Sequence, residues 1–449
     1  MGSEPEGAPS EAGREPSSPD TPHRVFVTVP LDGGYHDLAP ESDGEVPPAE
    51  ETRESIAAEA AEAAEGDDVE EEAPAVPTGP PPPVVLPVVD VEDLDWSAVR
   101  RSVDAARTRG GLHDTVERME TLLDRDGGPG FLFDADRAHP ADRAIRVTML
   151  GEDALLWIVG DLHGDLLALE AALALVRRDA TTTGVTPRIV LLGDLIDDGG
   201  FGLEVLVRVF TLMLESPGAI CLVAGNHDEA LQYTGARFGA TVSPSDFSDY
   251  LNAHLAHEWI TRAGKLAVRL FAMAPRALFL PDGLLITHGG FPLVDLHAEL
   301  RETGNWNDPR CLSDFTWTRA HARSRRKMPN RMSRGSQFGH EDFADFCALS
   351  AELGRPVTHM VRGHDHVDER YEIYPAYAAH PVLTTVALSR RLARESFGPY
   401  ERVPTIARWA AGALPQVHRL HVPPDAVREL YPEEVEVREA GHTADGERA

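Results

Sequence analysis

Leu155-Leu156-Trp157-Ile158-Val159 is an apolar run that ends in the polar turn Gly160-Asp161-Leu162-His163-Gly164. Short runs of apolar and β-branched residues bounded by glycine are typical of buried strands. The same pattern occurs four more times, and each turn carries Asp, Asn or His. The four further turns are Gly193-Asp194-Leu195-Ile196-Asp197, Gly225-Asn226-His227-Asp228, His288-Gly289-Gly290 and Gly363-His364-Asp365-His366.

The four further strands are expected over residues 188–192, 219–224, 284–287 and 359–361. Ligands of open α/β sheets bind at the carboxyl ends of the strands, so the turns would place a ring of oxygen and nitrogen donors along one sheet edge. Carboxylates mixed with imidazoles and an amide suit Mn²⁺, Fe or Zn²⁺. Two such ions roughly 3.5–4 Å apart clamp the attacking and leaving oxygens of a phosphoryl displacement. The pattern therefore predicts a two-metal phosphoesterase.

Taken in order, the five turns resemble the motifs GDxHG, GDxxDRG, GNHE, HGG and RGH of the calcineurin-like metallophosphoesterases. Within that superfamily they are most similar to the phosphoprotein phosphatase branch. The resemblance covers roughly residues 157–367. It implies an α/β fold, an αββα sandwich of mixed sheets flanked by helices.

The resemblance also implies which side chains hold two divalent metal ions, with Mn²⁺ the first choice and Fe or Zn²⁺ as alternatives. Asp161 and His163 would hold the first ion, and Asp194 would bridge both. The second ion would be held by Asn226, His288 and His364. A water between the ions would be deprotonated near neutral pH and would attack phosphorus.

His227 directly follows a predicted ligand, so its side chain should project beside the metal site. The resemblance assigns His227 as the general acid to the leaving oxygen and Asp197 as the carboxylate that orients it. A carboxylate fixes the tautomer of a histidine and raises its pKa, which keeps it protonated. The alternative for Asp197 is a cap of the following helix.

Two positions depart from the pattern around the second and third motifs. The family places Arg after Asp197, where it would contact phosphate, but this chain has Asp198 there, and Asp228 stands in place of Glu. Losing a cation and gaining an anion should weaken phosphate binding unless another basic residue compensates. Arg334, in a basic run that resembles the family's later arginine-glycine segment, is the predicted phosphate clamp, because a guanidinium matches phosphate bidentately.

His366 is a third departure. The phosphatase branch typically has an apolar residue two positions after its last ligand histidine, while phosphodiesterase branches show Gly-His-x-His. His366 is therefore either an extra ligand of the first ion or a donor that supports the ligands. The residue leaves the monoesterase and diesterase interpretations open.

The acidic residues of the 449-residue chain are concentrated at its N-terminus. The formal net charge is −32, and residues 1–90 hold 22 acidic and 3 basic side chains. A segment so rich in charge, Pro and Gly cannot bury enough apolar area to fold. We therefore expect a disordered acidic tail over residues 1–93, a catalytic domain over 94–432 with a helical insertion at 229–275, and a charged C-terminal tail over 433–449.

The overall charge and the cysteines limit the possible partners and compartments. A strongly acidic surface repels phosphate backbones and anionic lipid, which argues against nucleic acid and membrane as partners. No run approaches the ~20 apolar residues that span a bilayer. Three cysteines without a CxxC pair indicate a reducing compartment, most simply the cytoplasm. The sequence does not reveal the oligomeric state.

Three functions from different classes are compatible with these motifs. The leading hypothesis is a metal-dependent phosphomonoesterase acting on protein phosphoserine or phosphothreonine. The second is a small-molecule phosphodiesterase or dinucleoside polyphosphate hydrolase. The third, motivated by Asp198, is a catalytically weak binding or scaffold protein, although all six presumptive ligands and His227 are retained.

Overall fold

The structure is a computed structural model, and it describes residues 85–151, 154–325, 335–395 and 398–432. Residues 1–84 of the predicted acidic tail and the predicted C-terminal tail lie outside this part of the chain. Strand β1 (Val88–Val91) lies within the range predicted as tail, and it pairs in parallel with a strand near the C-terminus. The folded part therefore begins before Leu94, where the sequence analysis placed its start.

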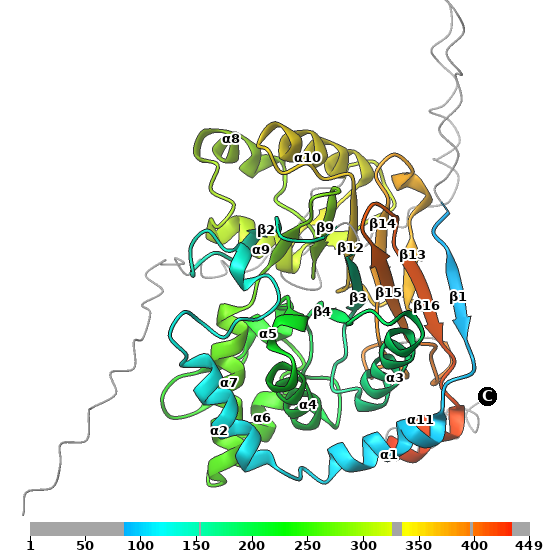
Figure 1. The fold of residues 1–449 in the computed structure, drawn as a ribbon. Helices are drawn as coiled ribbons and strands as arrows, with labels where there is room; N and C mark the ends of the chain where they lie inside the picture. Colours follow the sequence, from blue (N-terminus) through cyan, green and yellow to red (C-terminus); the bar gives the residue numbers. More distant parts are fainter. Residues whose placement is uncertain (1–84, 152–153, 326–334, 396–397, 433–449) are drawn as a thin grey trace, which may run out of the picture. The chain divides into compact units, whose positions relative to one another are not determined.

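Two six-stranded mixed sheets form the centre of the domain (Figure 1). The first sheet has the order β1, β16 (Gln416–Leu420), β15 (Thr405–Ala410), β3 (Leu155–Val159), β4 (Arg188–Leu191) and β5 (Ile220–Leu222). The second has the order β13 (Tyr371–Ile373), β14 (Val382–Thr385), β12 (His359–Arg362), β9 (Leu284–Thr287), β8 (Ala277–Phe279) and β2 (Ala144–Arg146). Two short pairs are β6 (Gln232–Tyr233) with β7 (Phe238–Gly239), and β10 (Arg319–Ala320) with β11 (Gln337–Phe338).

All five motif runs form strands, but they do not belong to one sheet. β3, β4 and β5 are parallel neighbours in the first sheet, whereas β9 and β12 are parallel neighbours in the second. The expectation of a single sheet edge is therefore wrong. Because the two sheets pack face to face, the carboxyl ends of both sets of strands still meet at one end of the sandwich.

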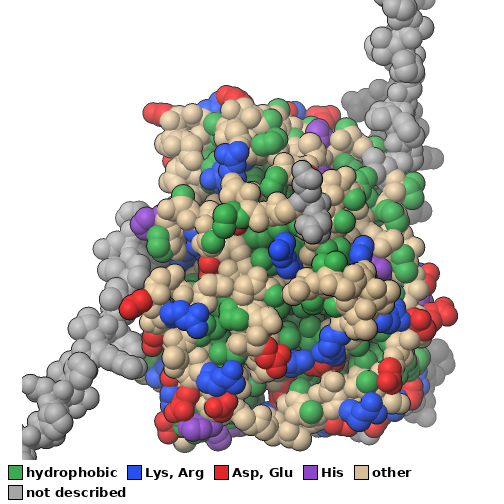
Figure 2. Space-filling view, in the orientation of Figure 1, with side chains coloured by type: hydrophobic (Ala, Val, Ile, Leu, Met, Phe, Trp, Pro, Cys, Tyr) green, Lys and Arg blue, Asp and Glu red, His purple; other side chains and the backbone are tan. Residues whose placement is uncertain are grey.

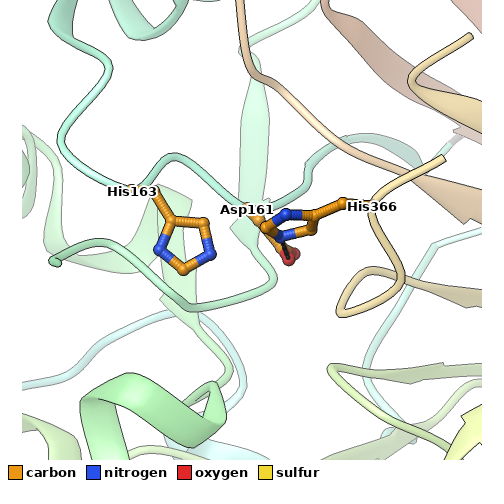
Figure 3. A group of neighbouring side chains, drawn as sticks. All are labelled: Asp161, His163 and His366. Carbon is orange, nitrogen blue, oxygen red and sulfur yellow. Dashed lines mark hydrogen bonds and ion pairs between the residues drawn. The ribbon is translucent and has the colours of Figure 1, made fainter. Parts of the chain in front are cut away.

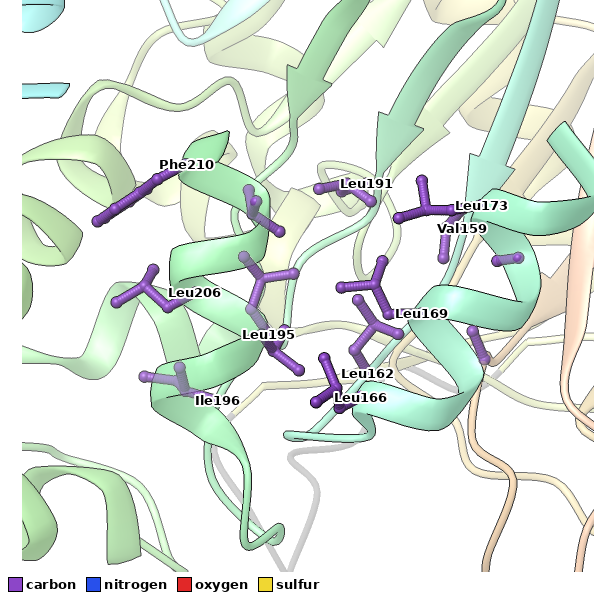
Figure 4. Close-up of a cluster of buried hydrophobic side chains, with 14 of the residues drawn as sticks. Val159, Leu162, Leu166, Leu169, Leu173, Leu191, Leu195, Ile196, Leu206 and Phe210 are labelled. Atoms are coloured by element: carbon purple, nitrogen blue, oxygen red, sulfur yellow. The ribbon is translucent and has the colours of Figure 1, made fainter. Parts of the chain in front are cut away.

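Strand β3 shows why the motif runs are apolar throughout. Leu156 and Ile158 pack in the core between the two sheets, while Trp157 and Val159 belong to the core between the first sheet and its helices. A strand buried on both faces needs no polar alternation. Figure 4 shows the helix-facing core, in which Val159 shares a cluster with residues of α3 and α4.

Helices cover the outer face of each sheet, which confirms the αββα architecture (Figure 1). The core beside the first sheet includes side chains from α1 (Trp96–Arg107), α2 (Leu112–Leu123), α3 (Leu166–Thr183), α4 (Gly202–Glu215), α6 (Asp246–Ala253), α7 (Glu258–Met273) and α11 (Pro424–Leu430). The core beside the second sheet includes side chains from α8 (Val294–Thr303), α9 (Pro309–Trp317) and α10 (His340–Glu352). The short α5 spans Asn226–Ala230.

The range 229–275 contains two of these helices, α6 and α7, and also the β6–β7 hairpin, which the sequence analysis did not predict. Within the described residues, we find no helix with both the length and the apolar character needed to cross a membrane. Figure 2 shows acidic and basic side chains interspersed over one face of the domain. This face therefore has a mixed electrostatic character.

Candidate metal centre

All six predicted metal ligands are buried just after the carboxyl ends of the five motif strands, five of them in turns and Asn226 at the start of α5. Each of these side chains is at most 5 % exposed. The ligands are Asp161 and His163 after β3, Asp194 after β4, Asn226 after β5, His288 after β9 and His364 after β12. A buried polar cluster of this kind is costly unless its members are paired or hold a cation.

The backbone of these turns adopts conformations that most residues avoid. His163, Asp194 and His364 all have positive φ, at 40°, 46° and 68°. Such strain is of order 1–3 kcal/mol per residue and is concentrated at functional sites. The glycines allow close approach: a Cβ on Gly225 would collide with the carboxylate of Asp194, and one on Gly363 with that of Asp161.

One group of converging donor atoms is centred on His288. Its Nε2 atom lies 3.1 Å from Asn226 Oδ1, 3.1 Å from His364 Nδ1 and 3.3 Å from Asp194 Oδ2. Donor atoms that share an ion at bond lengths of about 2.0–2.2 Å stand about 3–3.5 Å from one another. The separations and the mixture of N and O donors therefore fit a divalent ion held by these four side chains.

A second group brings Asp161, His163 and His366 together (Figure 3). His366 Nε2 lies 3.2 Å from Asp161 Oδ2, and His163 Nε2 lies 3.6 Å from Asp194 Oδ2. In Figure 3, His366 approaches Asp161 from a loop separate from the one that carries His163. Asp194 thus borders both groups, as a shared ligand would.

Backbone carbonyl groups orient two of the histidines. His163 Nδ1 lies 3.1 Å from the carbonyl of Ile196, and His288 Nδ1 lies 2.9 Å from the carbonyl of Leu192. Each Nδ1–H can donate to its carbonyl, which leaves the lone pair of Nε2 facing the donor group. Metal-binding histidines are commonly held in this way.

The charges in the cluster respond strongly to burial and to one another. Burial holds the pKa of His163 and of His364 well below the usual value, so both are neutral, as ligands must be. Burial also opposes a charge on His288, but the carboxylates of Asp194 and Asp161 outweigh it and raise the pKa of His288 to about 9. The carboxylates thus attract a proton here, and a divalent ion would satisfy the same attraction.

His227 and Asp197 form a buried pair beside the donor groups. His227 Nδ1 lies 2.8 Å from Asp197 Oδ2, and the His227 peptide N–H donates to Asp194 Oδ1 at 2.9 Å. The other oxygen of Asp197 accepts from the peptide N–H of Phe247 in α6. Burial opposes protonation of His227, but Asp194 and Asp197 overcome it and raise its pKa. Asp197 therefore orients His227 and does not cap α4, which begins after Phe201.

A hollow of about 460 Å³ opens over the cluster. Its lining includes the predicted residues Asp194, Asn226, His227 and His364, with His366 beside them. Five further lining residues were not predicted as site residues: Arg319, Asp365, Asp368, Arg394 and Glu395. The cluster is thus accessible to a ligand, and charged side chains of both signs surround it.

Residues 154–368 match the family model described as Calcineurin-like phosphoesterase. This part of the chain is a calcineurin-like phosphoesterase domain. The match covers all five motifs and every predicted metal ligand. The predicted resemblance is thereby confirmed.

Curated relatives of this calcineurin-like phosphoesterase are serine/threonine-protein phosphatases. The Drosophila melanogaster serine/threonine-protein phosphatase 6 catalytic subunit is 27 % identical over 229 residues, which are 47 % of this chain and 64 % of that protein. Serine/threonine-protein phosphatase 5 of Solanum lycopersicum is 24 % identical over 63 % of this chain and 46 % of its own length. The chain thus spans less than two thirds of the length of these relatives.

A solved structure similar to this chain is a serine/threonine phosphatase from Saccharomyces cerevisiae. The two have a TM-score of 0.45 and 13 % sequence identity, and the match covers 70 % of this chain and 89 % of that chain.

The structure places a second candidate cation beside Asp198. Arg334, the predicted compensating cation, lies outside the described residues. Arg394 lies at the site: its Nε is 2.9 Å from Asp198 Oδ2, and its Nη2 is 3.0 Å from His163 Nε2. Arg394 is 231 residues from His163 in an irregular loop, so no motif or periodicity identified it.

Asp228, which stands where the family has Glu, connects two of the motif turns. One carboxylate oxygen accepts from the Leu195 peptide N–H at 3.1 Å and the other from the Gly225 peptide N–H at 2.9 Å. The shorter side chain therefore still holds the turn after β4 against the turn after β5. Asp228 thus helps to place Asp194 and Asn226, which lie in or next to these turns.

Proposed function

We propose that this calcineurin-like phosphoesterase is a divalent-metal-dependent hydrolase of phosphomonoesters, with phosphoserine and phosphothreonine of proteins as its substrates. The observation that carries the proposal is the buried His227–Asp197 pair beside the donor groups. The peptide N–H of His227 donates to Asp194, which itself borders both groups of metal-compatible donors. The protein substrate class is taken from the relatives, which are serine/threonine-protein phosphatases.

In this proposal two ions occupy the two donor groups, with Mn²⁺ the first choice and Fe or Zn²⁺ as alternatives. Asp161, His163 and His366 would hold the first ion, and Asp194 would contribute to both sites. Asn226, His288 and His364 complete the second site. When bound, the ions supply positive charge at the phosphoryl oxygens and lower the pKa of the attacking water.

Protonation of the leaving oxygen is left to side chains of the protein. Nε2 of His227 carries the proton that the leaving oxygen needs, because Asp197 accepts the Nδ1–H and stabilises the charged ring. The Phe247 peptide N–H fixes the carboxylate of Asp197 from its other side. The direction of the proton donor is therefore set by α6 as well as by the motif turns.

A substrate panel tests this function. Purified protein with Mn²⁺ should hydrolyse a phosphoserine peptide and p-nitrophenyl phosphate faster than bis-p-nitrophenyl phosphate and diadenosine tetraphosphate, and EDTA should abolish turnover. Preference for the last two would favour the second candidate, a phosphodiesterase or dinucleoside polyphosphate hydrolase, which is motivated by His366 in the first donor group. If the metal-loaded protein hydrolyses none of the four substrates, the remaining candidate is the catalytically weak binding or scaffold protein.

We also propose a reducing, cytoplasmic location for the enzyme. All three cysteines of the chain are buried and none is in a disulfide. Burial raises the pKa of the Cys221 thiol to about 12, which makes it inert. A phosphorylated protein in the same compartment would then be the partner, without nucleic acid or membrane.

A further inference from the structure

Arg394 occupies a position in the site that no family motif describes. Its Nε faces the carboxylate of Asp198, at 2.9 Å, and its Nη2 lies 3.0 Å from His163 Nε2. The side chain is about one third exposed and lines the hollow over the metal cluster. A guanidinium is therefore placed between the first donor group and the space where a ligand would enter.

We propose that Arg394 is a substrate-binding residue that takes the phosphoryl group, and that Asp198 is the positioning residue that holds it there. The proposal rests on the proposed phosphoesterase function, and it names the residue that supplies positive charge to the bound phosphoryl group. The motif has lost the arginine that follows Asp197 in the family. The structure supplies an arginine from another part of the chain and uses the exchanged residue, Asp198, to orient it.

Asp198 is itself firmly placed. Its peptide N–H donates to Asp246 Oδ1 at 2.8 Å, and its carbonyl accepts from Arg390 Nη2 at 3.1 Å. Burial raises the pKa of its carboxyl, and the charge of Arg394 opposes that rise. Because both backbone groups of Asp198 are hydrogen-bonded, its carboxylate can hold the Arg394 guanidinium in place. A side chain that is already ordered loses less entropy when a ligand binds.

The loop that carries Arg394 is held on its other side by Glu395. The two oxygens of this carboxylate lie 2.6 Å and 2.9 Å from the guanidinium of the buried Arg370, and one of them lies 3.4 Å from His366 Nδ1. Two successive residues thus contact the first donor group, Arg394 at His163 and Glu395 at His366. The loop is positioned relative to the metal ligands by ion pairs on both sides.

The chemistry of the guanidinium then indicates the ligand. The Asp198 carboxylate pairs with Arg394 by charge at Nε, where Asp198 Oδ2 accepts no hydrogen bond, and the terminal nitrogens of Arg394 are left to other acceptors. The lone pair of His163 Nε2 cannot accept from Arg394 and bind an ion together, so metal binding frees Nη2 to face the hollow. Planar guanidinium donors match the oxygens of a phosphoryl group better than a lysine would.

Binding of inorganic phosphate to the Mn²⁺-loaded full chain, measured by calorimetry, tests the proposal independently of turnover. Arg394→Ala should raise the phosphate Kd by about 10- to 100-fold, the scale of a lost charged hydrogen bond. Arg394→Lys, which keeps the charge but not the fork, should lie between. Arg301→Ala is the matched control, because Arg301 pairs with Glu352 between α8 and α10, away from the hollow. The manganese content of each variant must equal that of the wild type.

A double variant tests whether Arg394 supplies the positive charge that the family places at position 198. Asp198→Arg combined with Arg394→Ala should recover part of the lost phosphate affinity, because it returns a guanidinium to the motif position. A wild-type Kd in Arg394→Ala and Arg394→Lys, or no phosphate binding by the metal-loaded wild type, would overturn the proposal. The substrate panel reads the proposed function separately, so a protein that binds phosphate through Arg394 but hydrolyses nothing refutes only the function.

Discussion

Asp197 Oδ2 lies 2.8 Å from His227 Nδ1, and both side chains are 98 % buried beside the metal cluster. Asp197 also accepts a hydrogen bond from the Phe247 peptide N–H through its other oxygen. This second bond fixes the rotation of the carboxylate, so that Oδ2 faces His227. The pair links the motif turn after β4 to the motif turn after β5. In the proposed function, this pair adds a proton donor to the candidate metal ligands.

His227→Ala should lower kcat on a phosphoserine peptide by about 10²–10⁴, the usual contribution of a general acid. The loss should be smaller on p-nitrophenyl phosphate, because its leaving group needs little protonation. Steady-state kinetics on the two substrates measure the difference. Equal losses on both would argue that His227 acts on something other than the leaving oxygen.

His366→Gln distinguishes a metal ligand from a residue that only supports the ligands. Removing an outer partner of a metal ligand typically costs about 10–100-fold in metal affinity, and Glu395→Gln, which changes the partner of His366 Nδ1, should fall in that range. A direct ligand should cost more, so His366→Gln should exceed about 100-fold for one of the two ions. The metal affinity is measured by titration of the stripped protein.

The control for that experiment is His380→Gln, because His380 lies outside the donor groups and contacts the carbonyl of Thr358. If His366→Gln weakens metal binding no more than Glu395→Gln does, His366 is a supporting residue. In that case the diesterase alternative loses its main motivation.

Gly225→Ala should disturb the metal site through the backbone. A Cβ at this position would collide with the carboxylate and peptide nitrogen of Asp194, so the shared ligand must move. We expect weaker metal binding and a loss of turnover, with a folded protein by circular dichroism. Gly239→Ala is the matched control, since a Cβ there meets nothing within 4 Å. Normal metal content in Gly225→Ala would show that the turn can relax.

The motif strands and their ligands were accessible to sequence reasoning because each is a local pattern. β3 and β9 have the predicted bounds of Leu155–Val159 and Leu284–Thr287. An apolar run followed by glycine and a polar residue needs no distant partner to be recognised. The same locality makes the motifs recognisable, and their resemblance to the family is what allowed the six candidate ligands to be named before the fold was known.

What the sequence could not predict depends on contacts between distant segments. The division of the motif strands between two sheets follows from packing, which an apolar run does not encode. Arg394 reaches His163 from an irregular loop, and Asp198 owes its orientation to Asp246 of α6. No local sequence pattern marks these side chains, because tertiary contacts alone bring them to the site.

The most direct measurement is the manganese stoichiometry and phosphoserine-peptide turnover of stripped and reloaded protein, for the wild type and for Asp194→Asn. Asp194 borders both donor groups, so it should be needed for both ions. The account predicts two ions per chain and full recovery of turnover in the wild type, and loss of turnover with fewer than two ions in a folded Asp194→Asn. Wild-type metal content and activity in Asp194→Asn, or turnover that persists after chelation, would contradict it.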